Sequence, residues 1–470
     1  MKVAKGDIYS QANSIPELKF EDQQLTSFAG LVVFQKLFRS CRLKERLEES
    51  CAHLVGRHYY SFSTIVQCLI VHIILGYRQL RESEFYREDP LVKRVLGLKA
   101  LPSVPTVSRI LSEFNDHSVA LQQEANRDLV LERLQEEAFQ TVTMDFDGSV
   151  QSTKRHAEGT AVGYNKENKG ARSYYPLFCT IAQTGQVLDV LHRSGNVHDS
   201  KGALEFVTAC VQTVRECLGN SVRLEARLDS AFFSDAMVQR LEQLGVEYSI
   251  SVPFERFTAL KGLIEKRKLW WSVPNSEGKS HQFESRWKPQ SWTRKRRFIF
   301  IRNTVGLQNK EPVQLDLFAP VQEGYEFKVI ITNKTGAAGK VAHFHEGRGY
   351  QEKIYAELKN HAQMGYVPAR RLVANKVYLL CSIFAHNLSR ELQMQVQEPV
   401  RGTTEKRTVR WLFEELDTLR KTIIARAGRL TRPQGKLTLT LNANPTVKNL
   451  LLRFLAGSVA TLQEQSDMLS

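Results

Sequence analysis

The chain has 470 residues, 42% hydrophobic and 24% charged, which is the composition of a folded protein with a sizeable core rather than a disordered chain. Its 65 Lys and Arg outnumber 50 Asp and Glu, giving a net charge of +15 that favours a polyanionic partner such as nucleic acid over a merely solvated surface. Its seven cysteines include no CxxC pair, which argues against a zinc ribbon, and their odd number in a long chain fits a reducing compartment better than a disulfide framework.

The sequence shows neither a secretory signal nor a run long enough for a membrane span. The start, MKVAKGDIYSQANS, lacks the apolar stretch of a secretory signal. The most apolar run, TIVQCLIVHIILGY, has 14 residues, which is short for a membrane span and suits a buried helix. We therefore expect a cytoplasmic protein with no membrane partner.

Residues 1–139 are predicted to be a helical, DNA-binding region, because apolar positions recur there at helical spacing. In LPSVPTVSRILSEFN (101–115), Ser103 or Thr106 is a candidate N-cap and a proline stands near the helix start. The helix that follows carries Arg109. It fits the recognition half of a helix-turn-helix, and it fits a plain three-helix core equally well.

From residue 140 the pattern changes to strands. TVTMDFDGSV (141–150) alternates, and SYYPLFCTIAQTGQVLDVLHR (173–193) holds two strand-like runs around a turn. A helix at 200–219, a strand at 221–229, a short helix and a further strand complete residues 140–252. The order β-β-β-α-β-α-β is that of an RNase H-like core, so the fold class is α/β with helical regions at both ends.

Residues 253–327 interrupt this order, and we interpret them as a mainly β insertion within the core. The segment holds four of the five tryptophans, for which simple packing is one explanation. A basic run beside these aromatic residues also fits a DNA-contacting edge, through phosphate pairing and stacking, formed by Arg294, Lys295, Arg296 and Arg297. Residues 328–399 return to the core with a long helix, and 400–470 form a basic C-terminal region of separate character.

Two carboxylates share one face of the first predicted strand. Side chains alternate in a strand, so Val142, Met144 and Phe146 face one side and Asp145 and Asp147 face the other. Burying carboxylates is costly unless a cation or hydrogen bonds satisfy them, and a metal site is a better explanation than a solvated strand end.

Asp229 ends a later strand, and in a core of this topology it lies beside the first strand and faces Asp147. Its alternative role is to cap the following helix, a role that Ser230 or Ser234 is also suited to fill.

The helix containing YQEKIYAELK places four side chains on one stripe. Arg348, Glu352 and Lys359 stand 3, 7 and 14 residues after His345. Taken alone, such spacing is also typical of charge pairs on a solvated helix. Glu357 points away from this stripe, and we interpret it as a solvated residue or one at the edge of the packing face.

These motifs carry a resemblance. The spacing His345-x2-Arg348-x3-Glu352-x6-Lys359 is similar to the Y-R-E-K signature of bacterial transposases of the insertion sequence 4 group. The segments MDFDGSV, GYNKENKGARSYYPLF, LDSAFFS and GRGYQEKIYAELK most resemble its insertion sequence 1380 family, over about residues 140–390. The family's tyrosine is a histidine here, whose imidazole is still able to donate a hydrogen bond to phosphate.

The resemblance implies a DDE transposase whose catalytic, metal-holding residues are Asp147, Asp229 and Glu352. Asp147 matches the first aspartate because it precedes Gly148 and Ser149, and Asp145 is the backup candidate. Three carboxylates hold two Mg²⁺ ions, or Mn²⁺, one activating a water or 3′-hydroxyl and the other stabilising the leaving oxygen. In this interpretation Arg348 and Lys359, with help from His345, neutralise phosphates.

The implied function is cut-and-paste transposition in the bacterial cytoplasm, at the nucleoid. The enzyme would bind the terminal inverted repeats of its element, cleave the DNA and join it to target DNA, as a homodimer on paired ends. Cleavage of the second strand through a DNA hairpin is a further expectation from related enzymes. The alternatives are a catalytically silent, transposase-derived DNA-binding protein and a metal-dependent nuclease of RNase H-like fold.

Overall fold

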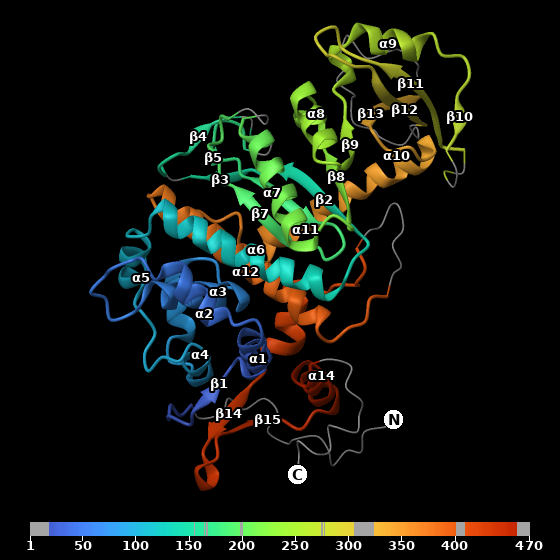
Figure 1. Ribbon diagram of the computed structural model, residues 1–470. Helices are drawn as coiled ribbons and strands as arrows, with labels where there is room; N and C mark the ends of the chain where they lie inside the picture. Colours follow the sequence, from blue (N-terminus) through green and yellow to red (C-terminus); the bar gives the residue numbers. More distant parts are fainter. Residues whose placement is uncertain are drawn as a thin grey trace.

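The computed structural model describes most of the chain, namely residues 18–154, 156–163, 165, 168–197, 201–273, 276, 278–304, 324–400 and 409–457. The chain start, three residues of the GYNKENKGARSYYPLF segment, the far part of the predicted insertion and both ends of the basic C-terminal region lie outside the described residues. Figure 1 shows a helical part and a sheet-bearing part, with the long helices α6 (Asp116–Glu136) and α12 (Leu372–Met394) side by side between them.

The N-terminal part is helical, as its apolar spacing predicts. Its other helices are α1 (Val32–Ser40), α2 (Leu43–Cys51), α3 (Phe62–Ile74), α4 (Pro90–Val95) and α5 (Val104–Leu111). α3 is the predicted apolar helix, capped by Ser61 and buried along most of its length. At α5, Ser103 rather than Thr106 is the N-cap, because its hydroxyl accepts the backbone N–H of Thr106. In the described part of the chain, no helix combines the length and apolar character needed to cross a membrane.

A nine-stranded mixed sheet forms the second part, in the order β10-β11-β12-β13-β9-β8-β2-β6-β7. The five core strands are β2 (Thr141–Gly148), β6 (Leu177–Ile181), β7 (Val187–Leu191), β8 (Arg223–Leu228) and β9 (Glu247–Ser251). β2, β6 and β7 form an antiparallel meander, and β8 and β9 lie parallel to β2 on its other side. The helices α7 (Ala203–Leu218) and α8 (Asp235–Gln243) connect them, so the predicted element order is confirmed.

The two faces of β2 pack differently, as the alternation predicts. Val142, Met144 and Phe146 are fully buried in one hydrophobic cluster with residues of α7 and α8. The opposite face meets a long helical segment near the end of the core. A small antiparallel sheet of β3 (Gln151–Thr153), β4 (Ala161–Val162) and β5 (Arg172–Tyr174) lies between β2 and β6 in the chain and was not predicted.

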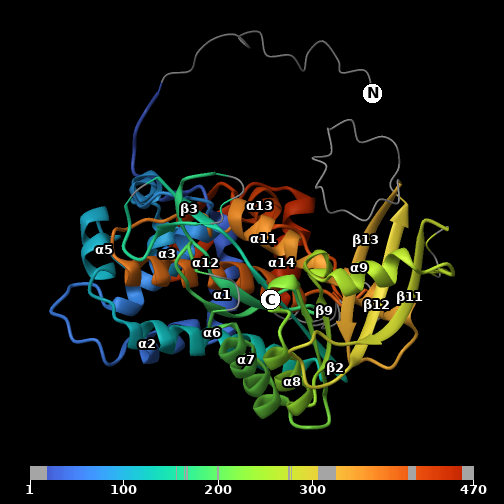
Figure 2. The same ribbon diagram turned by 90° about the horizontal axis from the view of Figure 1, so that it is seen from above.

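The insertion widens the core sheet instead of forming a separate one. Its strands are β10 (Trp271–Ser272), β11 (Ser280–Trp287), β12 (Arg296–Thr304) and β13 (Tyr325–Thr332), and β13 pairs with β9. Figure 2 shows β11, β12 and β13 at one side of the molecule, opposite the N-terminal helices. Packing accounts for Trp270, Trp287 and Trp292, whose rings contact phenylalanines, whereas Trp271 is 67% exposed.

The predicted final core helix is a helical segment in three pieces. α10 (Ala338–Glu346) passes through the 3-10 turn η6 (Gly347–Gly349) into α11 (Tyr350–Asn360). A 3-10 turn has about three residues per turn, so it rotates α11 relative to α10 and divides the single stripe expected from His345 to Lys359.

The described C-terminal residues pack on the N-terminal region and are not a separate body. They form α13 (Leu416–Leu419), β14 (Gly428–Thr431), β15 (Thr438–Leu441) and α14 (Pro445–Ala456). β14 pairs with β1 (Leu25–Thr26). The backbones approach so closely that a Cβ at Gly30 would lie 1.9 Å from the carbonyl oxygen of Ile423, which only glycine allows.

Candidate active site

Two aspartates meet at the carboxyl ends of the adjacent parallel strands β2 and β8. Phe146 stands opposite Leu228 in the parallel register, so Asp147 and Asp229 follow side by side. The pKa of Asp147 is raised to about 6, because burial and the neighbouring Asp229 carboxylate together outweigh the lowering effect of Arg348. The two carboxylates therefore share one partly buried negative site.

Asp229 also has the capping role that the sequence leaves open. Its Oδ1 accepts the backbone N–H of Ala231 at 2.9 Å and caps the short turn η4 (Ser230–Phe232). The N-cap of α8 is Ser234, whose hydroxyl accepts the N–H of Met237 at 3.2 Å. Capping occupies one carboxylate oxygen of Asp229 and fixes the side chain at the strand end.

The segment from η6 into α11 lies across this site and is fixed to β2 by three side chains. Arg348 donates from Nη1 to Oδ2 of Asp147 at 2.8 Å, and both side chains are about one-fifth exposed. Gln351 donates to the backbone carbonyl of Asp145, and the Tyr355 hydroxyl donates to that of Asp147, each at 3.0 Å. Offsets of 3 and 7 from Arg348 place all three on one helical face.

Glu352 lies next to this face but not among the aspartates. It follows Arg348 by one helical turn, and its side chain is exposed. Its carboxylate stabilises the charged form of Lys328 in β13. Burial and the nearby Arg348 lower the pKa of Lys328, while Glu352 and other glutamates oppose that shift. Among the described residues, no group of three or more His, Cys, Asp or Glu side chains is arranged to hold a metal ion.

Asp145, the backup for Asp147, is engaged elsewhere. Its carboxylate is 1% exposed and accepts two hydrogen bonds from the fully buried Arg227, at 2.6 and 2.7 Å. Arg227 also donates to the carbonyl oxygen of Phe344, at the end of α10. The prediction of Asp145 as a metal ligand is therefore corrected, because a bidentate guanidinium already satisfies its carboxylate.

His345 is similarly unavailable for a phosphate. It is 1% exposed, with its ring nitrogens 2.9 Å from the Ser249 hydroxyl and 2.8 Å from the Ser251 hydroxyl. Burial and nearby cations lower its pKa well below the ordinary value, so the ring is neutral. The sequence prediction of a DNA contact at this residue is corrected to an anchor of α10 on β9.

The basic run 294–297 is divided between solvent and interior. Arg294 and Lys295 are exposed. Arg296 is 6% exposed and pairs with Glu242 at 2.9 Å and with an aspartate of α8, which corrects its assignment as a DNA contact. Arg297 pairs with Glu284 and donates to two loop carbonyls, so its guanidinium is also engaged.

The other predicted DNA contacts, Lys359 on α11 and Arg109 on α5, are half-buried and exposed, respectively. Arg109 is exposed while Val107 and Ile110 of the same helix are buried, an arrangement that both interpretations of α5 allow.

Glu357 is not a solvated residue, contrary to the sequence interpretation. It is 4% exposed, pairs with the equally buried Arg390 of α12, and accepts the backbone N–H of Leu416 at 3.2 Å. One sequence signal could have located it, because Ile354 and Leu358 stand three residues before and one residue after it on the packing face. Glu357 thus anchors α11, while Glu352 on the same helix is exposed.

Comparison with known proteins identifies the family of the chain. The cryo-EM structure of a piggyBac transposase synaptic complex with hairpin DNA is 9% identical, with a TM-score of 0.41, covering 93% of this chain and 84% of that one. A Mos1 transposase paired-end complex with the left transposon end is 13% identical, with a TM-score of 0.17, covering 42% and 60%. No curated protein matches the chain. Residues 11–463 match the family described as Transposase DDE domain group 1, and the chain belongs to that family.

Proposed function

We propose that this protein is a cut-and-paste transposase that cleaves DNA at the ends of its element and joins them to target DNA. The observation that carries the proposal is the pairing of Asp147 and Asp229 at adjacent strand ends, beneath α11, in a chain of a DDE transposase family. The strand order β7-β6-β2-β8-β9, with β6 alone antiparallel to both neighbours, supports an RNase H-like core.

The residues at the site fit divalent metal ions of the magnesium type. Asp147, Asp229 and Glu352 offer only oxygen donors, which Mg²⁺ and Mn²⁺ prefer. Burial raises the pKa of Asp147 despite the Arg348 guanidinium, so in the folded protein its carboxylate is less stable as an anion than in water, and a bound cation would stabilise it. Two bound ions would supply activation of the attacking water or 3′-hydroxyl and stabilisation of the leaving oxygen.

The chain's own residues would prepare the site for that chemistry. Gln351 and Tyr355 hold α11 against the backbone of β2, which sets the distance between Glu352 and the aspartates. Arg348, which contacts Asp147 in this structure, would bind a phosphate oxygen beside the cleaved bond if divalent ions replaced it as the partner of that carboxylate. Lys359, further along α11, would contact the same DNA strand.

The finer assignment follows from the sequence. The Arg348, Glu352 and Lys359 spacing supports membership of the insertion sequence 4 group, closest to its 1380 family, with the element's terminal inverted repeats as substrate. Arg294, Lys295 and Arg109 remain proposed DNA contacts because their side chains are exposed. A homodimer on paired ends is part of the proposal.

A second candidate, a DNA-binding protein that no longer cleaves, is favoured by the Arg348 contact to Asp147. In such a protein the Arg348 guanidinium takes the place of a metal ion at Asp147, and Glu352 stays apart from the two aspartates. The two candidates differ only in metal-dependent chemistry.

Purified protein incubated with a labelled terminal-repeat duplex, a target plasmid and Mg²⁺ tests the proposal. Wild type is expected to cleave and join, and Glu352→Gln to bind with both activities lost. Glu346→Gln is the matched control, since Glu346 is an exposed carboxylate at the end of α10. Binding without cleavage by wild type would establish the second candidate, and full activity of Glu352→Gln would remove that residue from the site.

A further inference from the structure

Two neighbouring cavities open along the sheet edge opposite the two aspartates. The first, about 620 Å³, is lined by Thr141, Arg223 and Glu247, which begin β2, β8 and β9. The second, about 770 Å³, is lined by residues at the adjoining ends of β11, β12 and β13. They share Lys334 and Thr335, so they form one trough, named here the amino-edge trough.

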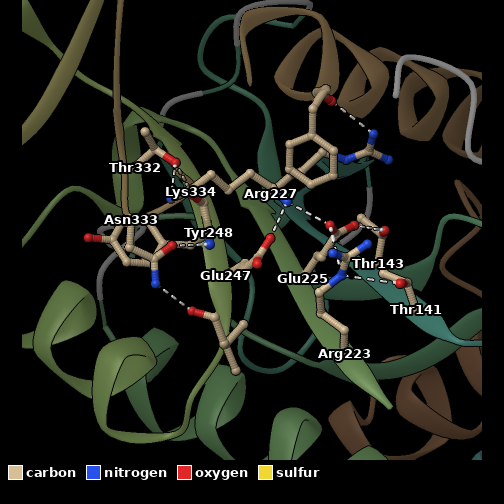
Figure 3. Close-up of polar contacts among 12 residues, drawn as sticks. Thr141, Thr143, Arg223, Glu225, Arg227, Glu247, Tyr248, Thr332, Asn333 and Lys334 are labelled. Carbon is tan, nitrogen blue, oxygen red and sulfur yellow. Dashed lines mark hydrogen bonds and ion pairs between the residues drawn. The ribbon is translucent and has the colours of Figure 1, made fainter. Parts of the chain in front are cut away.

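The trough is strongly cationic. Nine different Lys and Arg residues line it against four Glu residues, and those four carboxylates are already paired. Figure 3 shows Lys334 directed between Glu225 and Glu247. The charge left for a ligand includes Arg286, Arg294 and Lys295, which are exposed and form no ion pair with another described residue.

Specific side-chain contacts hold the centre of the trough in place. Arg297 donates to the carbonyl oxygens of Lys334 and Gly336 at 2.6 and 2.7 Å, and so holds the loop between the two cavities. The Lys334 ammonium lies 4.3 Å from the centre of the Phe344 ring. α10 begins in the first cavity without a side-chain cap, so its first backbone N–H groups add positive potential.

The size of the trough selects its occupant. It passes the ends of six neighbouring strands, from β11 to β2, whose five spacings of ~4.8 Å make roughly 24 Å. One strand of duplex DNA presents about seven phosphates over that length, at ~3.4 Å each. Asp147 lies six residues along β2 from Thr141, roughly 20 Å away at ~3.3 Å per residue.

We infer that the amino-edge trough binds the phosphate backbone of a second segment of duplex DNA, apart from the segment cleaved at Asp147 and Asp229. The inference rests on the proposed function for its choice of DNA as the polyanion. The segment is either the flank of the element end or the target DNA, which offer the same phosphate chemistry.

The test measures the affinity of the full-length protein for a random-sequence duplex over a range of salt concentrations. Arg286→Ala/Arg294→Ala/Lys295→Ala is compared with wild type and with Lys44→Ala/Lys93→Ala/Lys421→Ala. The control removes the same charge from lysines already paired with acidic neighbours. The slope of log Kobs against log salt is negative. Its magnitude is expected to decrease by about 2 to 3 in the trough variant, at ~0.9 per phosphate contact, and to stay unchanged in the control.

Equal slopes for wild type and the folded trough variant, checked by circular dichroism, overturn the inference. If the magnitude of the slope decreases, the cleavage and joining reactions of the trough variant identify which DNA segment the trough binds. Loss of joining from a pre-cleaved end identifies target DNA, and loss of cleavage identifies the flank. A wild-type protein that shows no cleavage in Mg²⁺ would refute the proposed function alone, because the salt slope is measured without catalysis.

Discussion

The neighbouring aspartates of β2 are expected to respond in opposite ways to loss of charge. Asp145→Asn removes the carboxylate that pairs with Arg227, whose side chain is 0% exposed. Asp147→Asn removes a carboxylate whose own side chain is 19% exposed and whose partner Arg348 is 20% exposed. The first change should destabilise the fold, and the second should abolish metal-dependent cleavage without destabilising it.

The magnitude follows from burial. Removing one partner of a buried ion pair leaves an uncompensated charge, at a cost of about 3–5 kcal/mol in the free energy of unfolding. Arg227 cannot turn to solvent, because its guanidinium also donates to the carbonyl oxygen of Phe344 at 3.1 Å. Asp147→Asn removes a charge whose burial and repulsion from Asp229 together outweigh its attraction to Arg348, so the free energy of unfolding should be unchanged or higher in metal-free buffer.

Urea denaturation followed by tryptophan fluorescence measures the stabilities, and cleavage of end DNA in Mg²⁺ measures activity. Asp116→Asn serves as a control, since its pair with Lys376 is mostly exposed on the aspartate side and its loss should cost less than about 1 kcal/mol. The reasoning is refuted if Asp145→Asn is as stable as wild type yet loses cleavage, because Asp145 would then act as a ligand.

Three further outcomes are expected. Arg390→Met leaves Glu357 buried without its cation and should lower the free energy of unfolding by about 3–5 kcal/mol, with partial recovery in the Glu357→Gln/Arg390→Met double variant. Folding raises the pKa of Asp147 from 3.8 to about 6, so the folded state binds the proton more tightly than the unfolded chain does. The free energy of unfolding without metal should therefore fall by about 3 kcal/mol as pH rises from 4 to above 6. Denaturation measured at each pH should show a flatter dependence for Asp147→Asn. Ser234→Ala removes the N-cap of α8 and should cost about 1 kcal/mol by the same denaturation measurement.

Local patterns predict the core because its elements are long enough to show a period. The alternation in β2 and the glycine that ends α7 each locate an element from neighbouring residues alone. The strands β3, β4 and β5 are two or three residues long and carry no period, so they escape such a pattern. The pairing of β13 with β9 spans about eighty residues, and no local signal specifies it.

The sequence does not show which side chains pair with one another at the site. The sequence places Asp145 and Asp147 on one face, but only the fold brings Arg227 from β8 to the first and Arg348 to the second. Arg296 likewise stands beside Lys295 in a uniform basic run. Strand β12 begins at Arg296 and turns that residue toward the buried side, while Lys295 stays in the loop.

The helical segment 338–360 relates the two proposed DNA surfaces physically. Its 23 residues, roughly 34 Å at ~1.5 Å each, begin in the amino-edge trough and carry Arg348, which contacts Asp147, and the exposed Glu352 one turn further on. Between these points the buried pair of Arg227 and Asp145 ties β8 and β2 to the carbonyl of Phe344 on α10. Because Phe344 lies between the trough and Arg348, a shift of α10 by DNA in the trough would have to disturb that buried contact before it moved Arg348 relative to Asp147. Disturbing a buried ion pair is costly, so this contact holds α10 in place and opposes the transmission of small shifts from the trough to the aspartates.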